Sequence, residues 1–164
     1  MKYASQTTVS VEKSRAEIET TLSRYGAEQF AYASDRERGL ASIQFSAVGR
    51  HVRFVLKLPL PCDPDFQRTP KGQARRRPQA IHEAWEQACR QRWRALALCI
   101  KAKLEAVECR IASFEAEFLA FIVLPGGMTV GQLIAPQIEQ AYVSGEVPPG
   151  IGGLLPYEQD VAVP

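Results

Sequence analysis

The most uneven chemical feature of the sequence is a run of basic side chains. Positions 68–77 carry five positive charges and no acid, at Arg68, Lys71, Arg75, Arg76 and Arg77. Such charges contact phosphates and release counterions, which is the part of nucleic-acid binding that does not depend on base sequence. This run therefore predicts a segment that contacts phosphates.

Basic and polar side chains also share one face of a predicted hairpin. Residues 52–58 alternate between apolar and polar types, which is typical of a strand with one buried face. The polar side of this strand carries His51, Arg53 and Lys57, and the neighbouring strand adds Gln44 and Ser46. A polar sheet face beside a basic loop suits a single strand of nucleic acid. This face shows no obvious aromatic side chain for base stacking, and Tyr32 is the only nearby candidate.

The helix that follows the basic run adds more positive charge. The nucleic-acid-binding residues predicted from the sequence are Arg53, Lys57, Arg68, Lys71, Arg75, Arg76, Arg77, Arg90, Arg94 and Lys101. The alternative is that the basic run is solvated and that the helix arginines pair with Glu86, Glu105 and Glu108, as surface charges usually do. The formal net charge of +2 does not decide between these interpretations.

The sequence lacks the motifs of the common catalytic and metal sites. The segment His82-Glu83-Ala84-Trp85-Glu86 begins like a zinc-protease helix, but Glu86 replaces the second histidine that the motif needs. Glu105 and Glu108 lack the ExxH partner of a di-iron site. A Gly-x-Ser-x-Gly nucleophile motif and a phosphate loop are also missing. We therefore expect a protein that is not an enzyme, with no catalytic residue, metal or cofactor.

The four cysteines do not have the spacing of a metal site. No pair forms a CxxC motif, and Cys89, Cys99 and Cys109 follow one another at ten-residue steps in a predicted helix. Ten residues rotate a helix by about 280°, so these three side chains cannot share one face. We expect Cys62 and these three to be reduced and buried, which fits a cytoplasmic protein.

Length and composition bound the architecture. The 164 residues, 46% hydrophobic and 23% charged, fit one domain with a buried core and exclude a fibrous or wholly disordered protein. No apolar run follows Met1-Lys2, and no uncharged stretch has the length of a membrane span. We expect no signal peptide and no contact with a membrane.

Apolar spacing predicts an α+β fold. Ser10 and Gly26 suit the two ends of an N-terminal helix. Alternating segments at Gln29–Ala33, Leu40–Val48 and Val52–Leu60 predict an antiparallel sheet of three or four strands.

A long helix follows. Residues 79–124 contain no Gly or Pro, and their apolar side chains recur every three or four residues. A straight helix of that length would measure about 69 Å, so we expect a break near 110–114 or packing on a second copy. Thr129 predicts the start of a C-terminal helix that extends to Tyr142.

Four segments are predicted along the chain. Residues 1–60 form an α/β meander unit, and residues 61–78 form a basic connector rich in proline. Residues 79–144 form a helical region that packs on the sheet or on a second copy. Residues 145–164 form a tail rich in Pro and Gly that contains Leu154, Leu155 and Tyr157.

Several stretches resemble a family of small proteins of tailed phages and prophages. They are Arg92-Trp93-Arg94-Ala95-Leu96-Ala97-Leu98, Ile100–Glu108, Leu124-Pro125-Gly126-Gly127-Met128-Thr129-Val130-Gly131 and Val11-Glu12-Lys13-Ser14. The resemblance covers about residues 8–145 and implies a phage protein that acts in the cytoplasm of a bacterial host. Small phage proteins in that setting handle DNA or disable a host defence component, which is an association and not a mechanism.

Two functional hypotheses follow. The first is a non-enzymatic phage protein that binds nucleic acid, most readily single-stranded DNA, with little sequence preference. The second is a protein-binding inhibitor of a host defence system, or an assembly factor, that uses the long helix and the tail 145–164. The expected partners are thus nucleic acid or a host or phage protein, and we expect a homo-oligomer.

Overall fold

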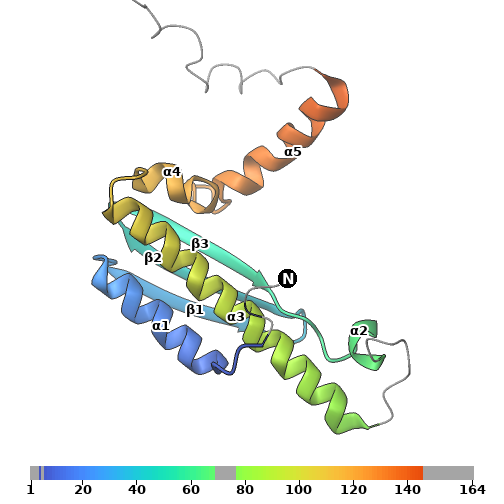
Figure 1. The fold of residues 1–164 in the computed structure, drawn as a ribbon. Helices are drawn as coiled ribbons and strands as arrows, with labels where there is room; N and C mark the ends of the chain where they lie inside the picture. The colour runs from blue at the N-terminus through green and yellow to red at the C-terminus, as the bar shows by residue number, and fades with distance from the viewer. Residues whose placement is uncertain (1–3, 5, 69–76, 146–164) are drawn as a thin grey trace, which may run out of the picture.

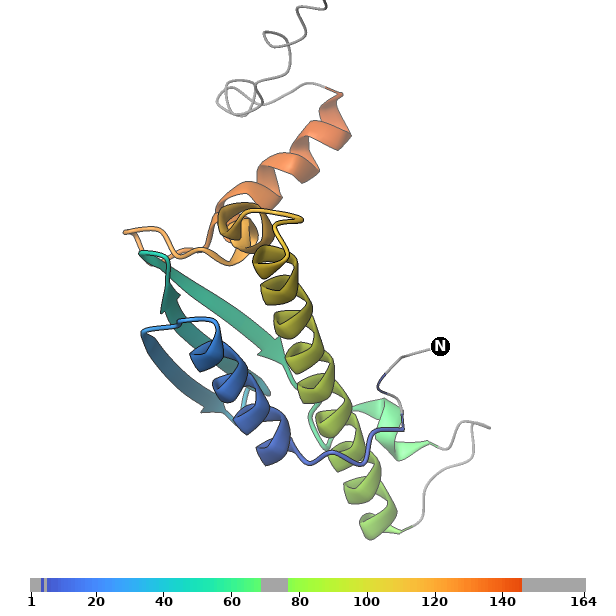
Figure 2. The same cartoon turned by 60° about the vertical axis from the view of Figure 1, so that its left-hand side comes forward.

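The chain forms a mixed α+β fold. The computed structural model describes residues 4, 6–68 and 77–145. The elements, in chain order, are α1 (Val11–Arg24), β1 (Gln29–Asp35), β2 (Leu40–Ala47), β3 (Arg50–Lys57), α2 (Pro64–Gln67), α3 (Pro78–Glu108), α4 (Phe114–Phe118), the 3-10 helix η1 (Leu119–Phe121) and α5 (Val130–Ser144). The three strands form an antiparallel sheet in the order β1-β2-β3. Helices α1 and α3 lie side by side on one face of it (Figure 1 and Figure 2). The fold class predicted from the sequence is confirmed.

Short turns fix the register of the sheet. Val48 and Gly49 join β2 to β3 with φ angles of 52° and 66°, the positive values of a tight two-residue hairpin loop. This loop sets Phe45 opposite Val52 and Ile43 opposite Phe54. Because side chains alternate along a strand, these four apolar residues all point to the same face.

That face is buried beneath the two helices. Ile18 and Leu22 of α1 and Trp93 and Ile100 of α3 are each at most 1% exposed. Ser10 begins α1 by accepting a hydrogen bond from the Lys13 amide, which confirms the predicted cap. The core thus lies between the sheet and the α1–α3 pair.

The long apolar series breaks where the sequence predicted a break. Helix α3 ends at Glu108, Arg110 takes a φ of 57°, and Ser113 caps α4 by accepting from the Ala116 amide. The break returns Phe118 to the core at 0% exposure, where its ring meets those of Phe45 and Phe54 edge-on. Two shorter pieces therefore cover the sheet in place of one rod.

A turn after η1 joins the sheet to α5. Ile122 bridges to Val52, and the Val123 amide donates to the His51 carbonyl at 2.8 Å. Thr129 and Gln132 then form a capping box at the start of α5, where the sequence predicted a cap. Gly131 permits the close approach of α5 to η1, because a Cβ there would lie 2.7 Å from the Ala120 carbonyl oxygen.

The predicted connector contains one short helix. Asp63 precedes α2, and Phe66 within α2 is buried. Residues 69–76, which include Lys71, Arg75 and Arg76, lie outside the described part of the chain. Within residues 4, 6–68 and 77–145, no helix combines the length and the apolar character needed to cross a membrane.

We predict that Trp93→Ala lowers the free energy of unfolding by about 3–5 kcal/mol, because it leaves a large cavity between α3 and the sheet. Trp85→Ala is the matched control, since Trp85 is only half-buried and its indole donates to the Pro59 carbonyl at the edge of the fold. Urea unfolding of both variants measures the difference. Equal losses would contradict the central place of Trp93 in the core.

Candidate nucleic-acid interface

The sheet face opposite the helices is open and polar. Cross-strand pairs place Gln29, Ser46 and His51 in one row and Ala31, Gln44 and Arg53 in the next, all on this face. The remaining rows are Ala33, Ser42 and Val55, followed by Asp35, Leu40 and Lys57. The predicted grouping of Gln44 and Ser46 with the basic side of β3 is therefore observed.

Arg53 is held firmly on this face. Its Nη2 atom donates to the Gly127 carbonyl at 2.7 Å and to the Gln132 side-chain oxygen at 3.2 Å. Its Nε atom is buried without a partner among the described residues. Both acceptors are neutral, so the guanidinium is oriented while its positive charge is not cancelled.

Lys57 extends the basic character of β3 toward the other end of the sheet. Its side chain is exposed, and its carbonyl accepts a hydrogen bond from Arg92 at 2.7 Å. Within the described residues the open face holds one carboxylate, Asp35, which lies 3.7 Å from the Arg38 guanidinium. The face thus offers donors and positive charge over most of its length.

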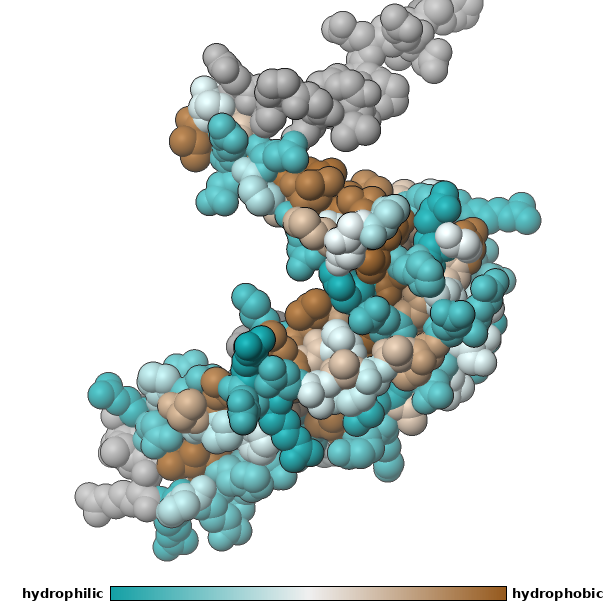
Figure 3. Space-filling view, turned by 180° about the vertical axis from the view of Figure 1, so that it is seen from behind, coloured by the Kyte–Doolittle hydropathy of each residue, from teal (hydrophilic) through white to brown (hydrophobic). Residues whose placement is uncertain are grey.

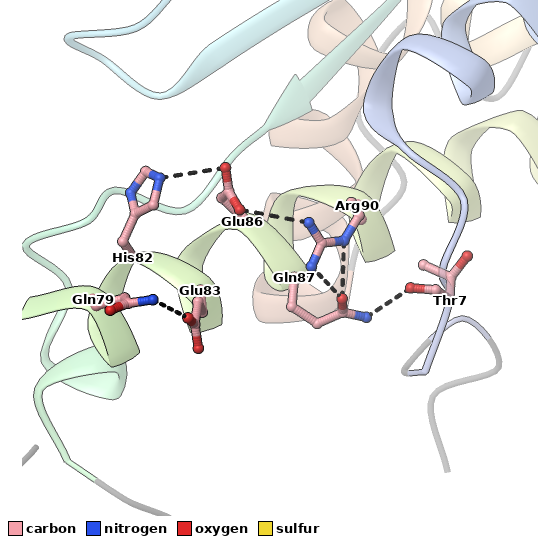
Figure 4. A network of polar contacts seen from close by, with 7 residues as sticks. All are labelled: Thr7, Gln79, His82, Glu83, Glu86, Gln87 and Arg90. Carbon is pink, nitrogen blue, oxygen red and sulfur yellow. Dashed lines mark hydrogen bonds and ion pairs between the residues drawn. The ribbon is translucent and has the colours of Figure 1, made fainter. Parts of the chain in front are cut away.

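Arg90 and Arg94 do not join this face. Arg94 forms an ion pair with Glu17 of α1, on the side of the sheet that the helices cover. Arg90 lies 3.7 Å from Glu86 and donates twice to Gln87, within the polar network drawn in Figure 4. The interpretation that helix arginines pair with acids fits both residues better than phosphate contact.

The remaining predicted residues are scattered. Lys101 is exposed on α3, away from the open face, and Arg77 is exposed just before α3. Arg68 is exposed directly after α2, and Lys71, Arg75 and Arg76 lie outside the described residues. Of the ten predicted residues, Arg53 and Lys57 are the two that the strand register brings to one surface.

Tyr32, the nearby aromatic candidate for base stacking, lies on the buried face of the sheet and not on the open one. Its ring lies 5.6 Å from that of Trp93, and the Arg15 guanidinium stacks over it at 3.6 Å. The reason is the register, which pairs Tyr32 with Ile43 on the buried side. No Phe, Tyr or Trp side chain of the described strands therefore faces outward for base stacking.

Among the acidic residues of α3 that were predicted to pair with helix arginines, Glu86 pairs with Arg90, whereas Glu105 has a different partner. The Tyr25 hydroxyl bonds to Glu105, and this hydrogen bond is the main cause of a raised pKa for Tyr25. His82 lies 3.3 Å from Glu86, as expected for side chains one helical turn apart (Figure 4). No cluster of three His, Cys, Asp or Glu side chains with metal-binding geometry occurs in the part of the chain that the structure describes.

The cysteines are free thiols with different environments. Cys89 is buried, whereas Cys62, Cys99 and Cys109 are exposed, so the expectation that all four are buried is wrong for three of them. For the three cysteines along α3 the helix phase explains this result, because Cys89 shares the core side with Trp93 and the ten-residue steps turn Cys99 and Cys109 outward. Cys62 lies in the turn before α2. Burial raises the pKa of the Cys89 thiol.

Sequence reasoning missed two features. It did not find the hydrogen bond of 2.7 Å between Ser46 Oγ and His51 Nδ1, although both residues flank the predicted hairpin. It also missed that α5 has no buried residue and exposes Leu133, Ile138 and Tyr142. The low charge of α5, which contains Glu139 as its one charged residue, could have signalled the second feature.

Comparison with known proteins adds no relative. Searches of protein families, of curated proteins and of solved structures find no match to this chain.

We predict that three thiols of the native protein react rapidly with a thiol reagent at mildly alkaline pH, and that Cys89 reacts only on unfolding. Exposed thiols supply the reactive thiolate, whereas burial and a raised pKa both withhold it in Cys89. Counting labelled cysteines by mass spectrometry measures this. The variant Cys89→Ala should keep three fast sites, and a fourth fast site in the native wild type would contradict the account.

Proposed function

We propose that this protein binds single-stranded nucleic acid along the open face of its sheet, without catalysing a reaction on it. One observation carries the proposal: this face presents two amides, two hydroxyls, an imidazole and two cations over three strands. Among the described residues, Asp35 is the one carboxylate on this face; it stands at a corner and is paired with Arg38. Such a surface attracts phosphates and hydrogen-bonds to bases.

The two cations of the open face are aligned along β3. Arg53 and Lys57 lie on the same side of β3, four residues and therefore about 13 Å apart. Beyond Lys57 the chain continues into the connector, which carries Arg68 and ends at Arg77. Positive charge thus extends from the middle of the sheet toward the N-terminus of α3, as a bound phosphate backbone requires.

The shape of this face favours a single strand over a duplex. Seen from behind the helices in Figure 3, the molecule is hollowed between the body and the projecting α5. Duplex grooves are read by elements that protrude into them, such as a helix or a two-stranded ribbon. A hollow beside the open face of a sheet instead suits a flexible strand that lies within it.

The binding set is narrower than the one predicted from the sequence. It retains Arg53, Lys57 and the basic connector, and it leaves out the ion-paired Arg90 and Arg94. A phage origin stays a prediction, and a protein that binds single strands would be one of the DNA-handling factors expected in that setting.

The test is a titration of a labelled single-stranded oligonucleotide at about 50 and 200 mM salt. We expect Lys57→Ala to weaken binding at the lower salt and to reduce the slope of log affinity against log salt by about one, because one phosphate contact is lost. The matched control is Lys101→Ala, which removes the same charge from an exposed position on α3. The proposal is refuted by no binding at low salt, or by equal losses in the two variants.

A second candidate function is protein binding through α5. Figure 3 shows hydrophobic side chains where α5 leaves the body. Leu133 and Ile138 are 45% and 47% exposed, and Tyr142 is 88% exposed. Exposed apolar clusters of this kind mark interfaces between proteins, and a second copy of the chain would satisfy the predicted homo-oligomer.

Light scattering distinguishes this candidate. If α5 pairs two copies, the wild type has twice the monomer mass of 18.2 kDa, and Ile138→Asp has the monomer mass. Gln140→Asp is the control, since it adds the same charge at an exposed position about 160° around α5 from Ile138. A monomeric wild type at micromolar concentration would exclude self-association through α5.

A further inference from the structure

A cavity of about 540 Å³ opens on the polar sheet face at the start of β3. Its floor includes Gln29, Gln44, Ser46 and His51, and its wall includes Leu124 and Pro125. The wall is fixed by two hydrogen bonds of 2.8 Å, from the Val123 amide to the His51 carbonyl and from the Leu124 amide to the Met128 carbonyl. Cavities of this size accept small organic groups.

The floor is a connected set of hydrogen-bonding groups. The Ser46 hydroxyl lies 3.4 Å from the Gln29 side-chain oxygen and 2.7 Å from His51 Nδ1, and the imidazole tautomer decides which partner donates in the shorter contact. Either tautomer leaves His51 Nε2 for a ligand, as an acceptor or as a donor, and the amide donors of Gln29 are also available. The carboxamide of Gln44 is exposed and has no hydrogen bond to any described residue.

These groups select a class of ligand. No residue that lines the cavity, within the described part of the chain, carries a carboxylate, so a cation finds no counter-charge. Fixed positive charge is also absent from the lining, so a phosphate would be held better by Arg53 in the adjacent position. A neutral ring with donors and acceptors on its edge matches the floor, and its flat face matches the apolar wall.

We propose that this cavity holds one base of the bound single strand and that Gln44 reads the edge of that base; this rests on the proposed function. A carboxamide pairs through two hydrogen bonds with the N6 and N7 positions of adenine, which makes adenine the best match. Gln44 and Arg53 face each other across β2 and β3, so base and phosphate contacts come from neighbouring side chains. The protein therefore prefers adenine at one position of an otherwise unselective strand.

The test compares oligodeoxyadenylate with oligothymidylate of equal length by fluorescence anisotropy at low salt. We expect the adenine strand to bind about tenfold more tightly, as one bidentate contact per site would give. Gln44→Met keeps the size of the side chain and removes its hydrogen bonds, so it should abolish the preference by weakening oligodeoxyadenylate binding more than oligothymidylate binding. Gln140→Met, at an exposed position on α5, is the matched control and should keep the preference.

The outcomes separate the two proposals. If neither strand binds the wild type, both the proposed function and this inference fail. If both strands bind with equal affinity, or if the preference persists in Gln44→Met, the base site is overturned and the proposed function stands. Loss of the preference in Gln44→Met alone supports the site.

Discussion

The structure depends on the burial of one face of a three-stranded sheet. Phe45 and Phe54 point toward α1 and α3, and Trp93 of α3 packs in the same core with 1% of its surface exposed. Because strand side chains alternate, the same register that buries these rings turns Gln44, Arg53 and their neighbours outward. The hydrophobic contacts that stabilise the fold therefore also create the polar surface to which we assign function.

The chain that follows the break after α3 contacts both the buried and the open face of the sheet. It brings Phe118 back against Phe45 and Phe54 on the buried side, and it continues to the edge of β3. There Arg53, from the open side, donates to the Gly127 carbonyl and to Gln132 at the start of α5. One aromatic cluster thus positions the wall of the cavity, and one arginine holds that wall to the sheet.

Local patterns were sufficient to predict most of the fold. The Ser10 and Thr129 caps, the hairpin at Gly49 and the break near Arg110 depend on neighbouring residues, and all are observed. The site was predicted only in part. Alternation placed Arg53 and Lys57 on the polar side of β3, but the partner of Arg94 lies in α1, 77 positions earlier in the chain. Such long-range pairs, and the cavity wall formed by residues 123–127, depend on tertiary packing that spacing does not encode.

The most direct test of a nucleic-acid interface on the open face is an NMR titration of the isotope-labelled protein with a single-stranded oligonucleotide. The account predicts shift changes in the side chains of Gln44, Arg53 and Lys57 and in the turn at 123–127, and none in α1 or around Arg90 and Arg94. Shift changes centred on α1 and α3, or none at all at low salt, would contradict it.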